Sequence, residues 1–359
     1  MDQVSVGVLV SAKALQRLRS NQVDRRLEAL LIANHSVGTK LFFFNLKGVD
    51  LAAHKIRGTH RTPAGEWRRA TFAYPQALYK RQAVTEENRT YASLLGQLRS
   101  RNTVYLNSQR QFDKWQVYQC LAQNPKLQPH LPLTWQITHW EQVLELAESN
   151  PVLYLKACRS GKGKKVLRLE RVRKNKYRYT WYVNGLTRGR VGKHSLISQL
   201  AKFFGDRELI AQTAIDLVRV EERIVDFRAE LQRNGSPRPQ VVAIPVRIAR
   251  TGSPITTHSA SMALEEFHRR HPNCIGNFSE FSRRAQEVLE EVYTTIEGCM
   301  GRCGEMGVDL GLDRQGKIWI IEANSQSTKV SLLNSYPKSL IVESFRGLLR
   351  FAQAEAQRI

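Results

Sequence analysis

The sequence is short of acidic residues and lacks any long hydrophobic run. Its 359 residues include 32 aspartates and glutamates against 55 lysines and arginines, which leaves a net charge of +23. A membrane-spanning helix needs about 18 or more consecutive apolar residues, and no such run occurs. The chain does not begin with a basic segment followed by a small-residue cleavage site, so we expect no signal peptide and a cytoplasmic location.

Cysteine is scarce as well. The five cysteines are odd in number and scattered along the chain. This pattern is typical of reduced thiols in a cytosolic protein, and none of the five is placed as a nucleophile.

The excess of positive charge has two interpretations. It predicts attraction to an anionic partner, such as a nucleotide, a nucleic acid, an acidic polymer or a lipid surface. An organism that uses Arg-rich protein surfaces in general would produce the same excess. The most basic stretch, residues 159–178, lies on and after a glycine-rich loop.

Hydrophobic patterning predicts a mixed α/β protein. Over residues 1–108, short apolar segments alternate with helical patterns, which favours an open-sheet α/β domain. The expected strands are residues 4–10, 40–46, 53–58, 67–72, 103–106, 152–156, 165–169, 208–215, 226–232, 241–250, 307–312 and 317–323. The expected helices are residues 11–32, 86–98, 112–121, 141–148, 282–303 and 339–354.

The most informative segment is an expected hairpin over residues 307–324. If residues 314–315 form its loop, residue 309 faces residue 320 on the partner strand. Side chains alternate along a strand, so every second residue shares a face. This register places four side chains together on one face: Asp309, Ile320, Glu322 and Asn324.

Three of these side chains carry hard oxygen donors. The carboxylates of Asp309 and Glu322 and the amide oxygen of Asn324 suit Mg²⁺ that bridges nucleotide phosphates. A solvent-facing polar edge is the alternative, but the strand around Glu322 is very apolar, and a buried carboxylate needs a partner. Asp313 heads a D-x-x-G turn, where aspartate serves local hydrogen bonding.

A basic glycine-rich loop follows the expected strand that ends at Lys156. It contains Ser160, Gly161 and Gly163, and its glycines would let backbone N–H groups approach phosphate oxygens while its lysines add charge. It is not a Walker loop, which reads GxxxxGK[ST]. A glycine hairpin with solvated lysines is the alternative.

Five further polar residues lie on expected helices and strands. Lys114 by itself reads as a helix-surface lysine. Gln212 ends an apolar strand whose free backbone groups could read an adenine edge. Asp226 and Arg228 alternate along a strand and share a face, and Arg247 lies on a later strand. A salt-bridge network accounts for these last three equally well.

These segments occur in the order of an ATP-grasp domain. Lys114 precedes a P-x-T segment at residues 132–134, and Lys156 precedes the glycine-rich loop. The G-V-D … E-A-N pattern of residues 307–324 resembles that of ribosomal-protein glutamate ligases and D-alanine ligases. The layout resembles even more closely the spore-coat-associated YheC/YheD-type ATP-grasp proteins, whose P-x-x-(apolar)-Y-x-R segment is similar to residues 75–81. Residues 305–309 and 319–324 also fit that family.

The resemblance implies an α/β fold of the ATP-grasp type. A two-lobed nucleotide clamp would follow a small open-sheet N-terminal domain. The expected division is an N-terminal domain over residues 1–108, a first lobe with the glycine-rich loop over residues 109–205, and a second lobe over residues 206–359. The second lobe would carry the metal site and the C-terminal helix.

The resemblance also implies ATP and Mg²⁺ as cofactors. Lys114 and Lys156 would contact the phosphates, with the loop at 160–163 closing over them. Gln212 and its neighbours, including Ile215, would hold adenine. The remaining implied roles are ribose contact for Asp226, catalytic charge stabilisation for Arg228 and Arg247, and metal binding for Asp309, Glu322 and Asn324.

Three departures separate this chain from the ligases that it resembles. D-alanine ligases have an arginine where this chain has Gly307. No proline follows Asn324, and residues 259–262 replace a glycine pair that is expected after the Arg247 strand. These changes concern the acyl-acceptor pocket and turnover, and they leave the nucleotide site in place.

Three functions fit these observations. The first is a carboxylate–amine or thiol ligase that acts through an acyl phosphate on an acidic carboxylate substrate. The second is an ATP-binding protein without turnover, located at the forespore or spore coat and partnered by coat components. The third, a nucleic-acid or anionic-polymer binder, ranks last because the aromatics at 177–182 fit a strand equally well.

Overall fold

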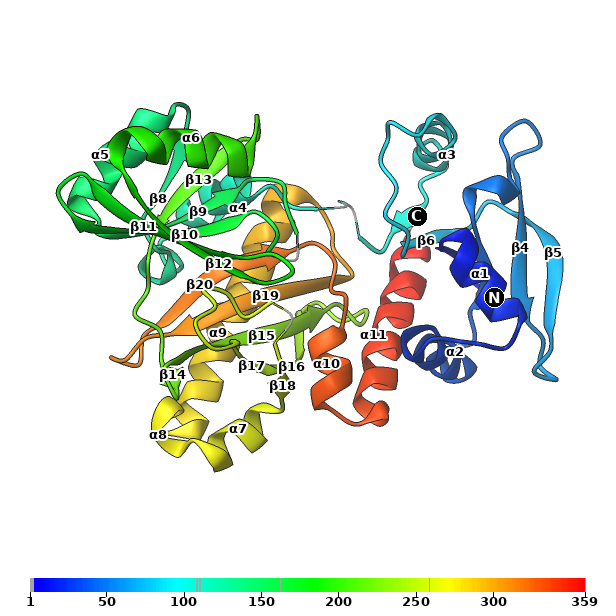
Figure 1. The fold of residues 1–359 in the computed structure, drawn as a ribbon. Coiled ribbons are helices and arrows are strands. Elements are labelled where there is room, and N and C mark those ends of the chain that lie inside the picture. The colour runs from blue at the N-terminus through cyan, green and yellow to red at the C-terminus, as the bar shows by residue number, and fades with distance from the viewer. Residues whose placement is uncertain (1–2, 108, 110, 162, 258, 359) are drawn as a thin grey trace.

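The computed structural model describes residues 3–107, 109, 111–161, 163–257 and 259–358. These residues form three β-sheets with helices around them (Figure 1). The mixed α/β architecture expected from the sequence is confirmed.

The first sheet belongs to an open α/β unit at the N-terminus. Strand β1 (Ser5–Leu9) pairs in parallel with β2 (Lys40–Phe44) and β6 (Ala77–Lys80). Helices α1 (Ala12–Arg19) and α2 (Arg25–Val37) connect β1 to β2. The apolar runs of β1 and β2 are buried on both faces, as is usual for parallel strands. The other elements of this unit are η1 (Leu46–Gly48), β3 (Val49–Asp50), β4 (Lys55–Arg61), β5 (Trp67–Ala73), α3 (Arg89–Arg99) and β7 (Val104–Tyr105).

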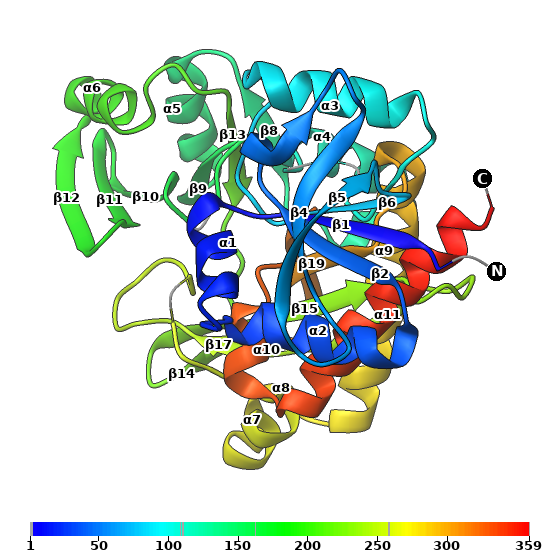
Figure 2. The same cartoon turned by 90° about the vertical axis from the view of Figure 1, so that its right-hand side faces the viewer.

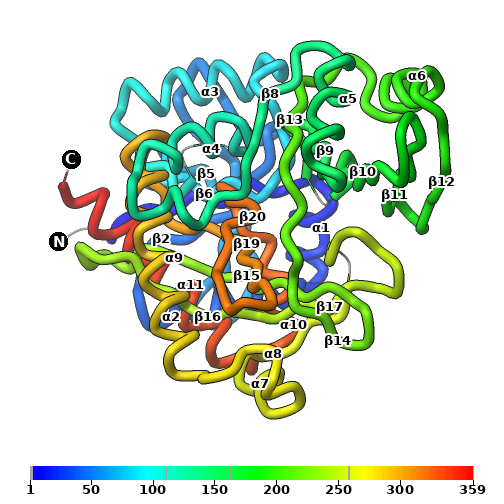
Figure 3. Tube along the Cα trace, turned by 90° about the vertical axis from the view of Figure 1, so that its left-hand side faces the viewer, coloured from blue at the N-terminus to red at the C-terminus, as the bar shows by residue number. Residues whose placement is uncertain are grey.

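The second sheet is antiparallel and has the strand order β12-β11-β10-β9-β13-β8. Apolar side chains of one face, including Leu155 and Leu167, pack under helices α5 (Trp140–Ser149) and α6 (Lys193–Phe204). Figure 3 shows both helices on the outer side of this sheet. The strands are β8 (Thr134–Ile137), β9 (Val152–Ala157), β10 (Val166–Arg173), β11 (Lys176–Tyr182), β12 (Leu186–Gly192) and β13 (Leu209–Thr213).

The third sheet is centred on β15 (Arg223–Gln232). Helix α9 (Phe278–Met300) buries the apolar stripe that its sequence predicts, including Ala285, Leu289 and Ile296, in the core of this sheet. The other strands are β14 (Arg219–Val220), β16 (Gln240–Ala243), β17 (Val246–Ile248), β18 (Ser261–Met262), β19 (Glu305–Leu312) and β20 (Ile318–Asn324). The nearby helices are α4 (Lys114–Ala122), η2 (Gln128–His130), α7 (Leu264–Arg270), α8 (Pro272–Ile275) and α10 (Val330–Ser335).

The C-terminal helix α11 (Lys338–Ala356) returns to the N-terminal unit. It lies beside α2 in both views (Figures 1 and 2), and Phe345 and Leu348 share a core with Leu27 and Leu30. Among the described residues, no helix is both long enough and apolar enough to cross a membrane.

Local chemistry explains where several elements depart from expectation. The helix expected up to residue 32 is two helices, because Asp24 accepts hydrogen bonds from two backbone N–H groups and caps the second. The strand expected over 241–250 is two strands, β16 and β17, with Pro245 between them. Proline cannot donate a ladder hydrogen bond. Strand β12 and helix α6 were not expected at all.

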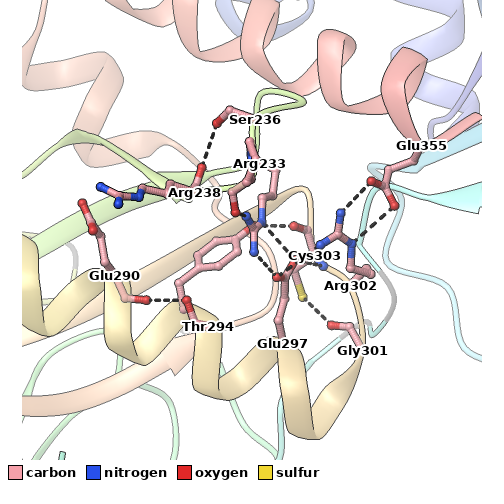
Figure 4. A network of polar contacts seen from close by, with 12 residues as sticks. Arg233, Ser236, Arg238, Glu290, Thr294, Glu297, Gly301, Arg302, Cys303 and Glu355 are labelled. Carbon is pink, nitrogen blue, oxygen red and sulfur yellow. Dashed lines mark hydrogen bonds and ion pairs between the residues drawn. The ribbon is translucent and has the colours of Figure 1, made fainter. Parts of the chain in front are cut away.

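A partly buried charge network joins the third sheet to α9 and α11 (Figure 4). Arg233 donates to Glu297 at 2.5 Å, and Arg302 lies between Glu297 and Glu355 of α11 at 3.7 and 2.6 Å. Glu297 also accepts from the backbone N–H of Cys303 at 3.2 Å. These contacts fix the end of α9 where the chain enters β19.

The prediction of five reduced thiols is wrong for one pair. Cys120 of α4 and Cys299 of α9 form a disulfide, whereas Cys158, Cys274 and Cys303 are not in disulfides. The pair is separated by 179 residues, so only the packing of α4 against α9 brings the two thiols together.

The disulfide predicts a thiol count. In denaturant without reductant, we expect three thiols per chain to react with a chromogenic disulfide reagent, and five after reduction. A Cys120→Ser variant serves as the control and should show four thiols under both conditions. Five reactive thiols in the unreduced wild type would contradict the pairing.

Candidate functional site

The hairpin of β19 and β20 has a different register from the one predicted. Its loop has three residues, 314–316, because Gly316 adopts a positive φ of 78° and Asp313 donates its N–H to the carbonyl of Lys317. Leu310 therefore faces Ile320, and both are buried in the core, so the placement of Ile320 on the site face was wrong.

A register shift further along the hairpin restores the carboxylate pair. Between Asp309 and Leu310 the pairing slips by one residue, and Ile321 has no partner on β19. Without this bulge, the longer loop would turn Glu322 to the opposite face. With it, Asp309 faces Glu322 directly and Asn324 faces Gly307.

Asp313 has the local role that its turn predicts. Its carboxylate accepts hydrogen bonds from the N–H groups of Gln315 and Lys317 and from the indole of Trp319, at 2.8 to 3.0 Å. It thereby closes the loop of the hairpin and stands apart from the metal-site candidates.

Two arginines converge on Asp309. Arg228 of β15 donates to Oδ1 at 2.8 Å, and Arg247 of β17 reaches the same oxygen at 3.1 Å. Burial would raise the pKa of Asp309, but the two guanidinium groups outweigh it and lower the pKa, so the carboxylate stays ionised. The guanidinium of Arg228 also fills the space beside Gly307, where a side chain would collide with it.

Asp226 is committed to Arg247. The two side chains form a bidentate pair at 2.7 and 2.5 Å, and Thr256 donates to the same carboxylate. Burial opposes the charge on Arg247, but Asp226 and Asp309 raise the pKa of its guanidinium. This geometry positions Arg247, while a ribose contact for Asp226 stays a prediction.

The hairpin oxygens form a donor set that suits Mg²⁺. Among the described residues, no group of three histidine, cysteine, aspartate or glutamate side chains could hold a metal alone. Asp309 and Glu322 supply two carboxylates. Asn324, with its amide oriented to satisfy both atoms, donates to Glu322 at 3.2 Å and accepts from Arg228 at 2.9 Å. Such a set fits a cation that takes its other oxygens from nucleotide phosphates.

Lys156 enters the site from strand β9 of the second sheet. Its side chain is 6% exposed, and its ammonium donates to the Gln212 amide oxygen at 2.6 Å. Gln212 in turn donates to Thr134 at 3.0 Å. Gln212, the residue predicted to hold adenine, thus positions the lysine that is predicted to contact phosphate.

Lys114 links the start of α4 to the hairpin. Its ammonium lies 3.4 Å from Glu322 and donates to the carbonyl of Ser160 at 2.9 Å. Asp113, which caps α4, pairs with Arg159 at 3.1 Å. The start of α4, the glycine-rich loop and the β19–β20 hairpin therefore meet at one place.

The glycine-rich loop between β9 and β10 packs against the segment between β17 and β18. Gly163 has a φ of +66°, and an added Cβ would collide with Ile255, so this position requires glycine. A Cβ added at Gly161 would meet no described heavy atom within 4 Å. The Ser160 hydroxyl donates to the carbonyl of Ala157 at 3.3 Å. Lys162 lies outside the described residues.

A cleft of about 450 Å³ runs between the second and third sheets. One end is charged and is lined by Lys156, Arg247, Asp309 and Glu322. Predicted residues Gly163, Gln212, Ile215 and Asp226 also line it, with apolar groups from Leu217, Ile224 and Ile321. Three further predicted residues contact the two carboxylates without lining the cleft. Lys114 and Asn324 contact Glu322, and Arg228 contacts Asp309. Sequence reasoning missed Tyr154 and Arg168, which also line the cleft.

A second buried cluster connects the N-terminal unit to this site. Glu305 is fully buried; it pairs with Lys329 at 3.1 Å and accepts from Tyr79 at 3.0 Å, while Arg81 lies 3.6 Å away. Glu230 continues the cluster to Arg228 at 3.8 Å. Lys329, which sequence reasoning missed, follows the hairpin in a polar stretch without a distinctive pattern.

The arrangement of two sheets around this cleft is that of an ATP-grasp protein. The chain is similar to D-alanine–D-alanine ligase from Bacillus anthracis, with 14% identity, a TM-score of 0.54, and coverage of 99% of this chain and 98% of that chain. It is also similar to the ATP-grasp ligase PsnB complexed with minimal precursor, Mg and ADP, with 10% identity, a TM-score of 0.51, and coverage of 97% and 98%. The predicted fold class is confirmed.

Residues 102–354 match the family described as YheC/D like ATP-grasp, and the chain belongs to this family. Two relatives from Bacillus subtilis (strain 168) are the endospore coat-associated proteins YheD and YheC. YheD is 26% identical over 235 residues, which cover 60% of this chain and 48% of YheD. YheC is 21% identical over 235 residues, which cover 63% of this chain and 62% of YheC. The matched part therefore spans about half of one relative and three fifths of the other.

Proposed function

We propose that this protein binds Mg-ATP between its two lobes and is an ATP-dependent ligase that activates a carboxylate. The direct pairing of Asp309 with Glu322, surrounded by Lys114, Arg228 and Arg247, carries the proposal. Two opposed carboxylates that are held by buried cations suit a metal–phosphate complex, and an ordinary hairpin edge has no need of them.

In this proposal, the adenine and the phosphates of the nucleotide occupy different ends of the cleft. The apolar groups around Ile215 and Ile321 suit the adenine ring. Lys156 and Lys114 suit the phosphates, which the loop with Gly163 would cover. When bound at Asp309, Glu322 and Asn324, Mg²⁺ would neutralise phosphate charge.

The chemistry follows from the charged end of the cleft. An oxygen of the substrate carboxylate attacks the γ-phosphorus of ATP, the bond to the β-phosphate oxygen breaks, and ADP leaves. An amine or thiol then attacks the acyl phosphate and releases inorganic phosphate, as its proton passes to solvent. Arg228 and Arg247 stabilise charge on the transferring group. The fold neighbours named above as ligases support this class of reaction.

ADP release tests the reaction. The protein is incubated with Mg-ATP and pools of carboxylates, first alone and then with pools of amines and thiols. We expect sustained ADP formation that needs both a carboxylate and an acceptor. If no pool raises ADP formation above that of the protein alone, the ligase proposal is wrong.

A second function is favoured by one observation. Asp226, Arg247 and Asp309 are joined in a closed ion-pair network, and the glycine pair expected near residues 259–262 is absent. A protein that holds ATP without consuming it, with a structural role at the spore coat, would retain such a network. The names of YheD and YheC support a coat location, which imaging of a fluorescent fusion in sporulating cells would test. Bound ATP that is consumed in a substrate-dependent way excludes this second function.

The ionisation of Lys156 predicts a pH dependence. Burial lowers the pKa of its ammonium to about 8, although Glu322 and Asp309 favour the charged form and Lys114 opposes it. The lysine therefore loses its charge as the pH rises through this value. Nucleotide affinity should fall roughly eightfold between pH 7.5 and pH 9.

Titration calorimetry with Mg-ADP at several pH values measures this fall. Lys156→Arg is the matched control, because a guanidinium keeps its charge over this range and should give a flatter profile. An unchanged slope in that variant would assign the pH dependence to another group.

A further inference from the structure

A second hollow, of about 660 Å³, opens from the nucleotide cleft. The two share five lining residues: Tyr154, Arg168, Arg219, Ile224 and Pro254. From this shared wall, the second hollow extends over strands β10 to β12 and is bounded opposite by residues 252–254. A ligand that lies in it can therefore reach into the cleft.

Strand register places four arginines of this hollow on one face of the second sheet. Arg168 pairs with Tyr154 on one side and with Thr180 on the other, and Thr180 pairs with Arg188. Arg178 pairs with Glu170 and Arg190 in the neighbouring row. Lys156 lies two residues from Tyr154 on β9 and thus shares this face. We call Arg168, Arg178, Arg188 and Arg190 the arginine face.

The positive charge of the arginine face is only partly compensated. Glu170 pairs with Arg168 at 2.7 Å and with Arg178 at 3.4 Å. Arg188 donates to the carbonyl of Gly252 at 3.1 Å and so connects the two walls of the hollow. Arg190 is exposed, and its side chain makes no hydrogen bond or ion pair with any residue that the structure describes. The surplus calls for an anionic ligand.

We infer that the arginine face binds an acidic peptide segment and leads one of its carboxylates toward the phosphate end of the cleft. Guanidinium groups bind carboxylates through paired hydrogen bonds. Strand β12 is an edge strand that pairs only with β11 among the described strands, so it can also pair with an extended peptide backbone. The inference rests on the proposed function for the fate of the carboxylate, but binding does not depend on it.

The aromatic residues of β11 favour a peptide over a nucleic acid. Single-stranded nucleic acids bind on exposed aromatic rings. Tyr179 and Trp181 stack on each other on the opposite face, and Trp181 packs on Phe203 of α6. Tyr182 lies on the arginine face, but Arg250 covers its ring and donates to its hydroxyl at 2.6 Å. No free aromatic ring of β11 is left to stack on a base.

Fluorescence anisotropy with labelled hexaglutamate, at low salt and without nucleotide, tests the inference. The double variant Arg178→Gln, Arg190→Gln should bind the peptide at least about tenfold more weakly than the wild type. The control Arg99→Gln, Arg283→Gln removes two exposed arginines elsewhere and should change binding less than about twofold. Arg190→Lys, which retains the charge, should bind between the wild type and the double variant.

Mg-ADP binding by each variant reports that the cleft is folded and should match the wild type. Equal loss of peptide binding in both double variants, or no binding of hexaglutamate by the wild type, would overturn the inference. Tighter binding of single-stranded RNA, lost in the same double variant, would assign the face to nucleic acid instead. If the peptide binds as expected but no ADP is released with any acceptor, the ligase proposal fails and the arginine face stands.

Discussion

Replacement of Glu322 by glutamine is expected to lower kcat for ADP release about 10²–10³-fold. The change removes one of the two opposed carboxylates, and a metal that neutralises phosphoryl charge is worth several kcal/mol in the transition state. The amide can still accept the 3.2 Å hydrogen bond from Asn324, so the hairpin should keep its shape. The measurement is a coupled ADP assay at saturating ATP over a range of Mg²⁺ concentrations.

The matched control is Glu287→Gln on the exposed side of α9, where the carboxylate pairs with Arg283. It removes the same charge and should leave kcat unchanged. The Glu322 variant should also need more Mg²⁺ for half-maximal rate. Wild-type activity and wild-type Mg²⁺ dependence in Glu322→Gln would refute the metal assignment.

Replacement of Lys329 by methionine is expected to reduce the free energy of unfolding by about 3–5 kcal/mol. Lys329 is 1% exposed and Glu305 is fully buried, so the variant leaves a carboxylate inside the protein without its closest cation. Arg81, at 3.6 Å, is too distant to replace a 3.1 Å contact fully. Urea denaturation followed by far-ultraviolet circular dichroism measures the loss.

Lys338→Met is the control, because Lys338 pairs with Glu28 on the surface and exposed pairs contribute about 0–1 kcal/mol. The double variant Lys329→Met, Glu305→Gln should recover part of the stability, since the second change removes the unpaired charge. A single-variant loss no larger than that of Lys338→Met would show that the buried pair does not stabilise the junction.

The sequence was sufficient to predict the fold class because its signals are local or ordered along the chain. Continuous apolar runs predicted the parallel strands β1 and β2, and the 3.6-residue period predicted α9. The order of Lys114, Lys156 and the hairpin residues indicated the ATP-grasp family without any distance information. The disulfide could not be predicted, because Cys120 and Cys299 meet only through tertiary packing.

The hairpin shows how a prediction can name the right residues from the wrong register. The pairing of Asp309 with Glu322 depends on a three-residue loop and on the bulge at Ile321, and each shifts the strand by one residue. Alternation along a strand specifies neither of these shifts. The two errors offset one another for Glu322 and Asn324 but not for Ile320, which faces the core.

The side-chain contacts among the site residues could not be predicted from the sequence, for a related reason. Gln212 holds Lys156, and Asp226 holds Arg247, although each pair comes from different strands and is set by sheet register. Periodicity can place a polar side chain on a face but cannot say whether a ligand or another side chain occupies its oxygens. The same limit hid the arginine face, because β12 was not expected.

The most direct test of a Mg-nucleotide site at Asp309 and Glu322 is calorimetric titration of the protein with ADP. One titration is done in the presence of Mg²⁺ and another in the presence of a chelator. We predict one site per chain whose affinity depends on Mg²⁺ in the wild type, and loss of that dependence in Glu322→Gln. An affinity that is the same with Mg²⁺ and with the chelator, or no binding at all, would contradict the account.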